Sequence, residues 1–207
     1  MRLKLTLKGQ DMKKTLTSVA LAAAMATSSL VAEDSGFFGG VNLGYGAAKP
    51  SGVGISGGNY TGFRYGLLGG YKEILSSNVG MRYYATLDFG GKYTNGSGNP
   101  EIRSINAYAN GDALFNFAHD DAMEYGAFVG LALGYVHHRI SGGGVGKTKP
   151  DGFDLGVNVG LRAQSFNHHS LEIYSRFGLL NQDVTALGYT FKVSQPYQVG
   201  VRYIYSF

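Results

Sequence analysis

Two glycine-rich stretches of this sequence match the letters of phosphate-binding motifs. Residues 52–57 read Gly-Val-Gly-Ile-Ser-Gly, as in a dinucleotide fingerprint, and residues 141–148 end in Gly-Lys-Thr, as in a phosphate loop. Both motifs need a helix that begins at the glycines, because the helix N-terminus holds the phosphate. The flanking residues predict no such helix, and Ser141 replaces the first glycine of the phosphate loop. We therefore interpret both stretches as loops.

A third group combines histidine and serine. His137, His138 and Ser141 fall near the end of one predicted strand, where they would suit a general base and a nucleophile. Such a pair needs a carboxylate that orients the histidine, and the sequence places none clearly beside it. His168 and His169 fall in a short turn at the opposite end, so a metal site shared with the first pair is not expected. We predict no catalytic residues, no metal site and no cofactor.

The candidate histidines and serine must be positioned by strands. Residues 197–207 show the alternating pattern of a strand most clearly. The odd positions of this stretch are Tyr197, Val199, Val201, Tyr203, Tyr205 and Phe207. A two-residue period predicts a strand, and a strand with one wholly apolar face suits contact with lipid. Tyr203, Tyr205 and Phe207 also resemble the C-terminal signal by which bacterial outer-membrane barrels are recognised for assembly.

The same alternation recurs in seven earlier segments. They are residues 37–45, 60–72, 79–91, 105–117, 125–137, 153–165 and 171–180. The joints alternate in length: those at 46–59, 92–104, 138–152 and 181–196 are long, and those at 73–78, 118–124 and 166–170 are short. Antiparallel neighbours place alternate joints at opposite ends, so all the long loops share one end. This predicts an all-β fold, an eight-stranded antiparallel up-and-down transmembrane β-barrel with extracellular loops above short turns.

The amino-terminal residues predict export. Lys13 and Lys14 precede an apolar run at residues 15–31, and the small residue Ala32 follows. This order is typical of a secretory signal peptide, which we place at residues 1–32, with Met12 as an alternative start. A membrane anchor is the other interpretation, but the run is short and holds many Ser and Thr. Residues 33–207 would then form the barrel.

The positive net charge of +4 belongs to this leader. Residues 1–32 hold five Lys and Arg against one Asp, and the remaining residues hold 13 Lys and Arg and 13 Asp and Glu. The charge therefore gives no indication of a nucleic-acid partner. The sequence has no cysteine, so a secreted domain would be held by its core or its environment rather than by disulfides.

The charged residues inside the predicted strands occupy the alternate positions that point to one face of the sheet, and the leucines and valines point to the other face. Seven of them form a predicted lumen charge network: Arg64, Asp88, Arg82, Asp112, Arg162, Glu172 and Arg202. Loop lengths place Arg64 roughly opposite Asp88. They also place Arg82 near Asp112, and Glu172 within reach of Arg162 and Arg202. Matched charges suit a narrow filled lumen, whereas a soluble barrel of the lipocalin type would turn its polar face outward.

Aromatic residues of the apolar phase gather near the strand ends. In a bilayer they would form two girdles at the interfaces, although strand-forming aromatics also occur in soluble β-sandwiches.

Several stretches resemble the Helicobacter-type outer membrane proteins, often called Hop-like. Residues 32–38 and 41–45 resemble that family's cleavage site and mature amino terminus. Residues 81–84 with 88–90 are similar to its Arg-Tyr-Tyr strand, and residues 203–207 to its carboxyl end. The resemblance implies an OmpA-like barrel in the outer membrane of a Gram-negative bacterium. Larger members that resemble adhesins carry a long insertion after the first strand, whereas here that joint is about a dozen residues.

We therefore expect a non-catalytic outer-membrane protein that is structural or presents a surface through its extracellular loops. Expected partners are outer-membrane lipid and lipopolysaccharide, the barrel assembly machinery through the C-terminal strand, and an unidentified host or surface ligand. A small pore or an adhesin is the alternative, and a lipid A-modifying enzyme that uses the rim histidines is a further one. Eight strands disfavour a pore, because side chains just fill their interior.

Overall fold

The computed structural model describes residues 34–51, 60–93, 101–119, 123–142, 145–148, 151–165, 168–186 and 189–207. The predicted signal peptide at residues 1–32 and the glycine-rich stretch at 52–57 lie outside the described residues. The described residues form these strands: β1 (Gly36–Ser51), β2 (Tyr60–Ser76), β3 (Val79–Tyr93), β4 (Glu101–His119), β5 (Met123–Gly142), β6 (Val145–Thr148), β7 (Asp151–Ser165), β8 (His169–Gly178), β9 (Asn181–Ala186), β10 (Tyr189–Ser194) and β11 (Gln198–Ser206). No helix in these ranges is long and apolar enough to cross a membrane.

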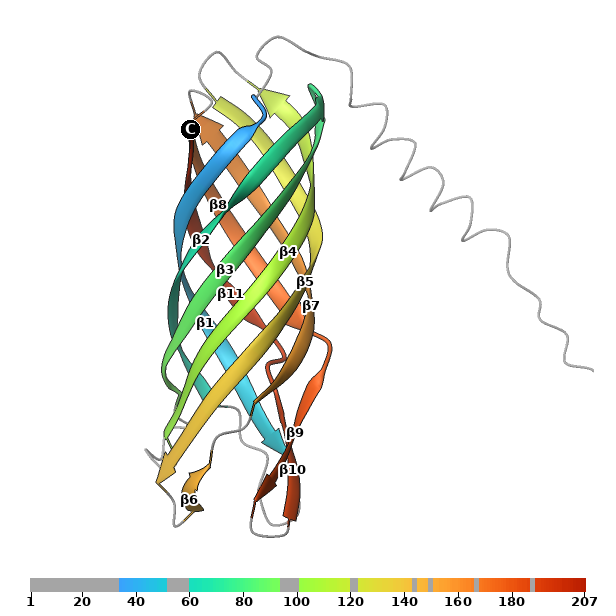
Figure 1. Ribbon diagram of the computed structural model, residues 1–207. Coiled ribbons are helices and arrows are strands. Elements are labelled where there is room, and N and C mark those ends of the chain that lie inside the picture. Colours follow the sequence, from blue (N-terminus) through green and yellow to red (C-terminus); the bar gives the residue numbers. More distant parts are fainter. Residues whose placement is uncertain are drawn as a thin grey trace, which may run out of the picture.

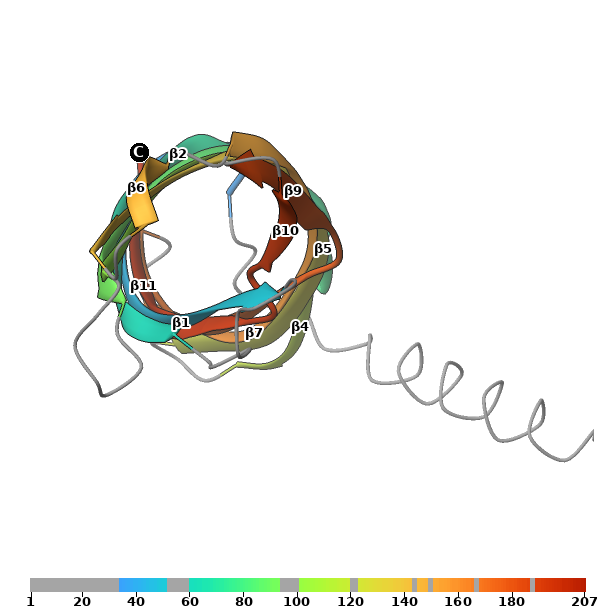
Figure 2. The same ribbon diagram turned by 90° about the horizontal axis from the view of Figure 1, so that it is seen from below.

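Eight of the strands form one closed wall, in the order β1, β2, β3, β4, β5, β7, β8 and β11 (Figure 1). Each pairs with the next in antiparallel orientation. The ring closes where β11 pairs with β1, from Phe38 opposite Ser206 to Gly46 opposite Gln198, and the end view shows the complete circle (Figure 2). The predicted eight-stranded up-and-down barrel is confirmed.

The wall strands are longer at one end than the alternation predicted. β1 continues to Ser51, β4 begins at Glu101, and β5 continues to Gly142. The joints at 138–152 and 181–196 are long, as predicted, and they also contain strands that the alternation did not predict, because β6 pairs with β5, and β9 and β10 form a hairpin. β10 also pairs with the end of β1, where Lys49 lies opposite Ser194. These additions supply partners to strand backbone that would otherwise form an open edge.

The short turns and the C-terminus lie at the other end of the barrel (Figure 1). Outer-membrane barrels have short turns on the periplasmic side and longer loops outside. We call the end that carries β6 and the β9–β10 hairpin the loop end.

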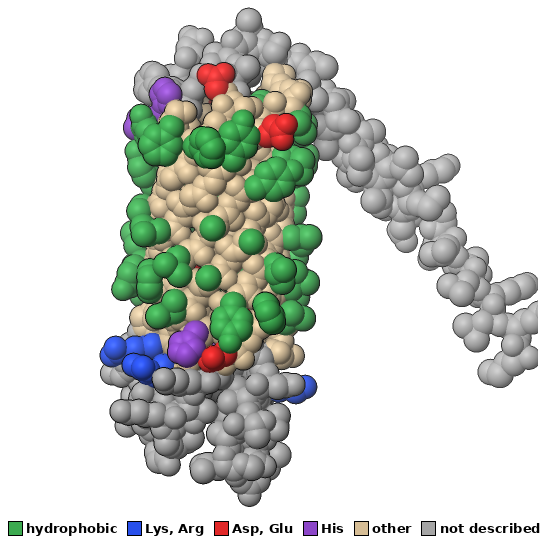
Figure 3. Space-filling view, in the orientation of Figure 1, with side chains coloured by type: hydrophobic (Ala, Val, Ile, Leu, Met, Phe, Trp, Pro, Cys, Tyr) green, Lys and Arg blue, Asp and Glu red, His purple; other side chains and the backbone are tan. Residues whose placement is uncertain are grey.

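Burial alternates residue by residue along the wall, as the sequence predicted. In β3, Tyr83 and Leu87 are exposed on the outer surface, whereas Arg82, Tyr84 and Asp88 are buried inside. The burial patterns of β2, β7, β8 and β11 repeat this alternation. Hydrophobic side chains consequently spread over the outer wall (Figure 3). The polar and charged side chains of the wall strands lie mainly in the lumen.

Glycines of the inner phase make room for large rings. A Cβ at Gly134 would overlap the ring of Tyr108, and a Cβ at Gly160 would overlap the ring of Phe128. Both rings come from a neighbouring strand and lie across the glycine backbone. Glycine on a strand commonly marks such a close approach. The lumen is therefore packed with side chains rather than open.

Leu131 tests which face of the wall meets lipid. It lies near the middle of β5 with 60% of its surface exposed. Leu131→Arg should lower the free energy of unfolding in lipid vesicles by about 2–4 kcal/mol, because a lipid-facing charge at mid-membrane loses its hydration. Urea titration followed by gel migration measures this, with Leu131→Met as the control. An arginine variant as stable as the methionine variant would contradict a lipid-facing position.

Candidate functional site

Two arginines and two carboxylates form a balanced cluster in the centre of the lumen. Arg82 on β3 lies opposite Asp112 on β4, and its Nη2 is 2.9 Å from Asp112 Oδ2. The same Nη2 donates to Glu172 Oε2 on β8 at 3.0 Å. Arg202 Nη1 on β11 is 3.9 Å from Glu172 Oε2. None of the four residues is more than 3% exposed. Because β3 and β8 lie on opposite sides of the ring, the contact of Arg82 with Glu172 connects opposite walls of the barrel.

Aromatic rings complete the surroundings of these guanidinium groups. The guanidinium of Arg202 lies 3.8 Å from the ring centre of Tyr174, and that of Arg82 lies 4.5 Å from the ring centre of Phe128. Arg202 Nη1 also donates to the Tyr84 hydroxyl at 3.1 Å. Cation–π contacts strengthen where water is excluded. The charges thus have both ionic and aromatic partners inside the barrel.

A second cluster surrounds Arg176, which was not part of the predicted network. Its Nη1 is 3.3 Å from Asp88 Oδ2, and its Nε and Nη2 donate to Asn158 and Asn110, each at 2.9 Å. The guanidinium also lies 4.1 Å from the ring centre of Tyr108. Arg176 shares the inner phase of β8 with Glu172, so the sequence did carry a signal. Its partner lies across the lumen on β3, which comparison of neighbouring strands cannot find.

The other predicted network residues take varied positions. Arg162 and Arg202 both lie opposite Glu172 in register, on the two flanking strands. The predicted alignment of Arg64 with Asp88 is wrong by two positions, because Arg64 lies opposite Gly90. Arg64 Nη1 donates to Gln195 Oε1 at 2.8 Å. Gln195 precedes β11 and closes the inner packing near the loop end.

The rim histidines face opposite sides of the wall. His137 is on the outer face, and its Nδ1 is 2.9 Å from Asp151 Oδ1. The prediction that no carboxylate orients a histidine here is therefore wrong. Register explains this contact, because His137 on β5 lies opposite Asp151 on β7. Ser141 is four residues further along β5, so its Cα is about 13 Å from that of His137, too far for a nucleophile and base.

His138 faces the lumen and is 1% exposed. Its Nε2 lies 3.2 Å from Gln195 Nε2, and Ser104 lies opposite it in register on β4. Ser104 is also buried, at 2% exposed. A substrate would have to enter the filled lumen to reach either side chain. The stretch that ends in Gly146, Lys147 and Thr148, which we interpreted as a loop, contains strand β6.

At the turn end, the remaining histidines contact the C-terminal strand. His168 Nδ1 is 2.9 Å from the Ser206 carbonyl oxygen, and His169 Nδ1 is 2.7 Å from the Tyr203 hydroxyl. The His169 ring also meets the Tyr205 ring edge to face. Across the described ranges, no three His, Asp or Glu side chains are grouped closely enough to hold a metal ion. These histidines serve as contacts of β11.

Comparison with protein families identifies a family for most of the barrel. A sequence model of the family described as Helicobacter outer membrane protein matches residues 66–207, more than half of the chain. No curated protein matches the chain.

Solved structures similar to this one are outer-membrane barrels. Neisserial surface protein A (NspA) has a TM-score of 0.52 and 17% identity, over 84% of this chain and 100% of that one. The outer membrane protein AlkL, solved in DMPC bilayers, has a TM-score of 0.51 and 14% identity, over 87% and 95%. OprG from Pseudomonas aeruginosa has a TM-score of 0.50 and 12% identity, over 85% and 98%. At these identities the likeness establishes the fold alone.

Glu172→Gln tests the central cluster. The change removes the carboxylate that contacts both Arg82 and Arg202, which leaves two buried guanidiniums short of negative charge. We expect a loss of about 3–5 kcal/mol in the free energy of unfolding, measured by urea titration in lipid vesicles. Asp151→Asn is the matched control, because its partly exposed pair at the rim should contribute only about 0–1 kcal/mol. Similar small losses in both variants would show that the central cluster does not stabilise the barrel.

Proposed function

We propose that this chain, which belongs to the Helicobacter outer membrane protein family, is a non-catalytic protein that presents a surface to the outside. As a member of that family, it is an integral β-barrel protein of the Gram-negative outer membrane. The presenting elements are the extended ends of β1, β4 and β5, strand β6 and the β9–β10 hairpin. The observation that carries this proposal is the filled lumen, which leaves the loop end as the part of the molecule available to a partner.

The central charge cluster supports this proposal over a pore. A pore needs a continuous water path, whereas Arg82, Asp112, Glu172 and Arg202 meet across the axis. Rings of Phe128 and Tyr174 pack against the same guanidiniums. Eight strands give a barrel whose interior side chains can fill.

The rim geometry supports a non-catalytic role. His137 has an orienting carboxylate in Asp151, but the Cα of Ser141, the candidate nucleophile, lies about 13 Å from that of His137 along the strand. The buried neighbours Ser104 and His138 have an amide, that of Gln195, beside the imidazole rather than a carboxylate. A serine triad needs nucleophile, base and orienting acid within hydrogen-bonding reach of one another.

We further propose that residues 1–32 are a cleaved signal peptide and that β11 engages the barrel assembly machinery. Tyr203, Tyr205 and Phe207 support the second point, because all three are exposed on the outer face of the strand that closes the ring. The same apolar face meets membrane lipid. At the loop end we propose contact with lipopolysaccharide, the glycolipid of the outer leaflet, and with a further surface ligand.

Epitope insertion tests which end faces outward. A tag placed between β9 and β10 should be labelled by antibody on intact cells, because the hairpin projects from the loop end. A tag placed between β2 and β3, after Ser77, should be labelled only after the outer membrane is permeabilised. Labelling in the reverse order would refute the proposed surface presentation.

Lipid A analysis tests the non-catalytic role. Mass spectra of lipid A from cells with and without the protein should show the same acyl pattern, because the backbone of Ser141 lies about 13 Å along the strand from that of His137. An altered pattern that His137→Ala abolishes would identify an enzyme instead.

A further inference from the structure

Gln195 enters the lumen at the loop end, although the alternation of the neighbouring strand would point it outward. In β11 the even-numbered residues, such as Gln198, are buried inside, and the odd-numbered ones, such as Val199, are exposed. Continued back along the chain, this pattern places Gln195 on the outer face. The segment between β10 and β11 is not a strand, and Pro196 in it has no N–H for a ladder. The chain changes direction there, and Gln195 is only 8% exposed.

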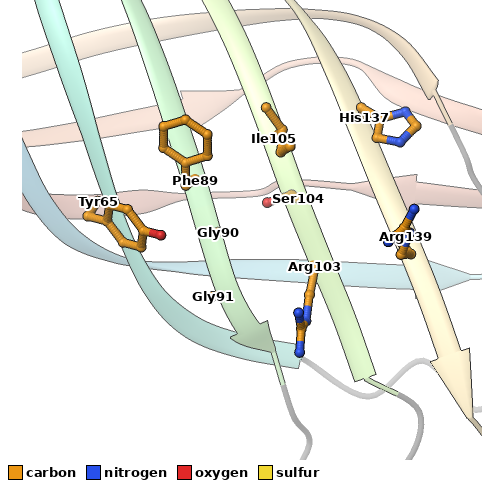
Figure 4. Close-up of a pocket in the computed structure, with 9 residues that line it drawn as sticks. All are labelled: Tyr65, Phe89, Gly90, Gly91, Arg103, Ser104, Ile105, His137 and Arg139. Carbon is orange, nitrogen blue, oxygen red and sulfur yellow. The ribbon is translucent and has the colours of Figure 1, made fainter.

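One row of inward positions receives the side chain of Gln195. Arg64 on β2 lies opposite Gly90 on β3. Gly90 in turn lies opposite Ser104 on β4, and the close-up shows these two positions side by side (Figure 4). Ser104 lies opposite His138 on β5. The row has a long side chain at each end and small residues between them, which leaves room for an amide.

The side-chain amide of Gln195 contacts both ends of this row. Arg64 Nη1 donates to its Oε1 at 2.8 Å, and its Nε2 lies 3.2 Å from His138 Nε2. The two partners are on β2 and β5, whereas Gln195 comes from the segment before β11, so the amide spans the mouth of the lumen. A hydrogen bond from a charged guanidinium is stronger than one between neutral groups. The contacts hold this segment against the inner wall.

The backbone of Gln195 packs against the last residue of β8. A Cβ on Gly178 would overlap the Gln195 carbonyl oxygen. A backbone oxygen cannot rotate away as the end of a side chain can, so any side chain at this position would displace the segment. Glycine on a strand commonly marks such a close approach. Gln195 is therefore fixed twice, by its side chain in the lumen and by its backbone at the wall.

The β9–β10 hairpin, which precedes Gln195, has only a short ladder to the wall in the described ranges. β10 pairs with β1 from Lys49 opposite Ser194 to Ser51 opposite Lys192. β9 pairs with β10, and the described residues form no ladder between β9 and a wall strand. Elements with few buried contacts open locally more readily than the core of a sheet. Since Gln195 directly follows β10, its contacts help to set the position of the hairpin.

Two polar atoms of the row stay unpaired while Gln195 is in place. Ser104 Oγ and His138 Nδ1 are buried and have no hydrogen-bond partner among the described residues. An unpaired buried polar atom costs free energy, which contact with water returns. Withdrawal of Gln195 would admit water to both atoms. The closed arrangement therefore carries a cost that opening relieves.

We propose that Gln195 is a latch that holds the β9–β10 hairpin at the loop-end mouth of the lumen. When the amide leaves Arg64 and His138, the hairpin moves with it and water enters a polar vestibule. The ion pairs of Arg82 with Asp112 and Glu172 lie further from the loops and remain closed, so opening creates a vestibule rather than a pore. The inference goes beyond the proposed function and holds whichever end of the barrel faces outward.

Cysteine labelling tests the closure, because the chain has no cysteine of its own. Ser104→Cys places one thiol in the row, and the folded barrel in detergent micelles is treated with iodoacetamide and followed by mass spectrometry. Adding Gln195→Ala should speed the labelling at least about tenfold, because opening then breaks no hydrogen bond to a charged group. Gln198→Ala, which removes another buried amide of the lumen, should leave the rate unchanged. Equal rates in these two variants would overturn the latch.

Two further variants separate a latch from a side chain that only fills space. Gln195→Glu keeps the size and gives Arg64 a charged partner, so the Ser104→Cys reporter should be labelled no faster than in the unmodified background. Gly178→Ala keeps the Gln195 side chain but displaces its backbone, so it should speed the labelling. If Gln195→Glu labels as fast as Gln195→Ala, the contact with Arg64 does not hold the segment and the latch is refuted.

Hydrogen exchange tests whether the hairpin moves with the latch. Gln195→Ala should speed amide exchange in β9 and β10, and leave exchange in β2 and β3 as it is. A Ser170→Cys reporter, buried at the turn end, should stay slowly labelled in the same variant. Unchanged exchange in the hairpin would overturn the inference. Fast labelling of the Ser170→Cys reporter would also overturn it, because the whole barrel and not its mouth would then have opened.

Discussion

The structure depends on one constraint, which is that the hydrocarbon core of a membrane supplies no water to backbone N–H and C=O groups. A sheet satisfies all of them only if its first and last strands pair. Here β11 meets β1 in a continuous antiparallel ladder, and this seam converts a row of hairpins into a closed wall. Once the ring is closed, each strand has one face toward lipid and one toward a narrow interior, and the sequence must satisfy both alternately.

The interior face sets the second requirement. Charges held there have little water, so they need partners on a neighbouring or a facing strand. Arg82 and Glu172 connect β3 with β8, and Arg176 and Asp88 connect the same two strands at another level. These two ion pairs across the lumen help to fill the barrel and block a path for solutes. A partner can consequently contact the protein only at the loop end and the outer rim.

Much of this arrangement could be predicted from alternation alone. The period of two, the phase of the charges and the alternating joint lengths predicted the wall, its closure and the adjacency of Arg82 and Asp112. The pairing of Arg176 with Asp88 could not be predicted, because it depends on which strands face each other across a closed ring. The contact of His137 with Asp151 depends on a register set beyond a long joint. The β9–β10 hairpin escaped prediction because it lies outside the membrane, where no lipid-facing pattern is required.

The two-residue rhythm of the wall, which is interrupted by register shifts near the ends of β2, β3 and β4, also governs how such a chain can vary. A substitution changes one position on one face, but the loss or gain of a single residue within a wall strand exchanges the faces of everything beyond it. Arginines would then be directed at acyl chains and leucines at the lumen charges. Changes in length should therefore fall mainly in the joints. Closely related barrels should differ freely in the length of their extracellular ends while keeping the residue count of each membrane-crossing segment almost fixed.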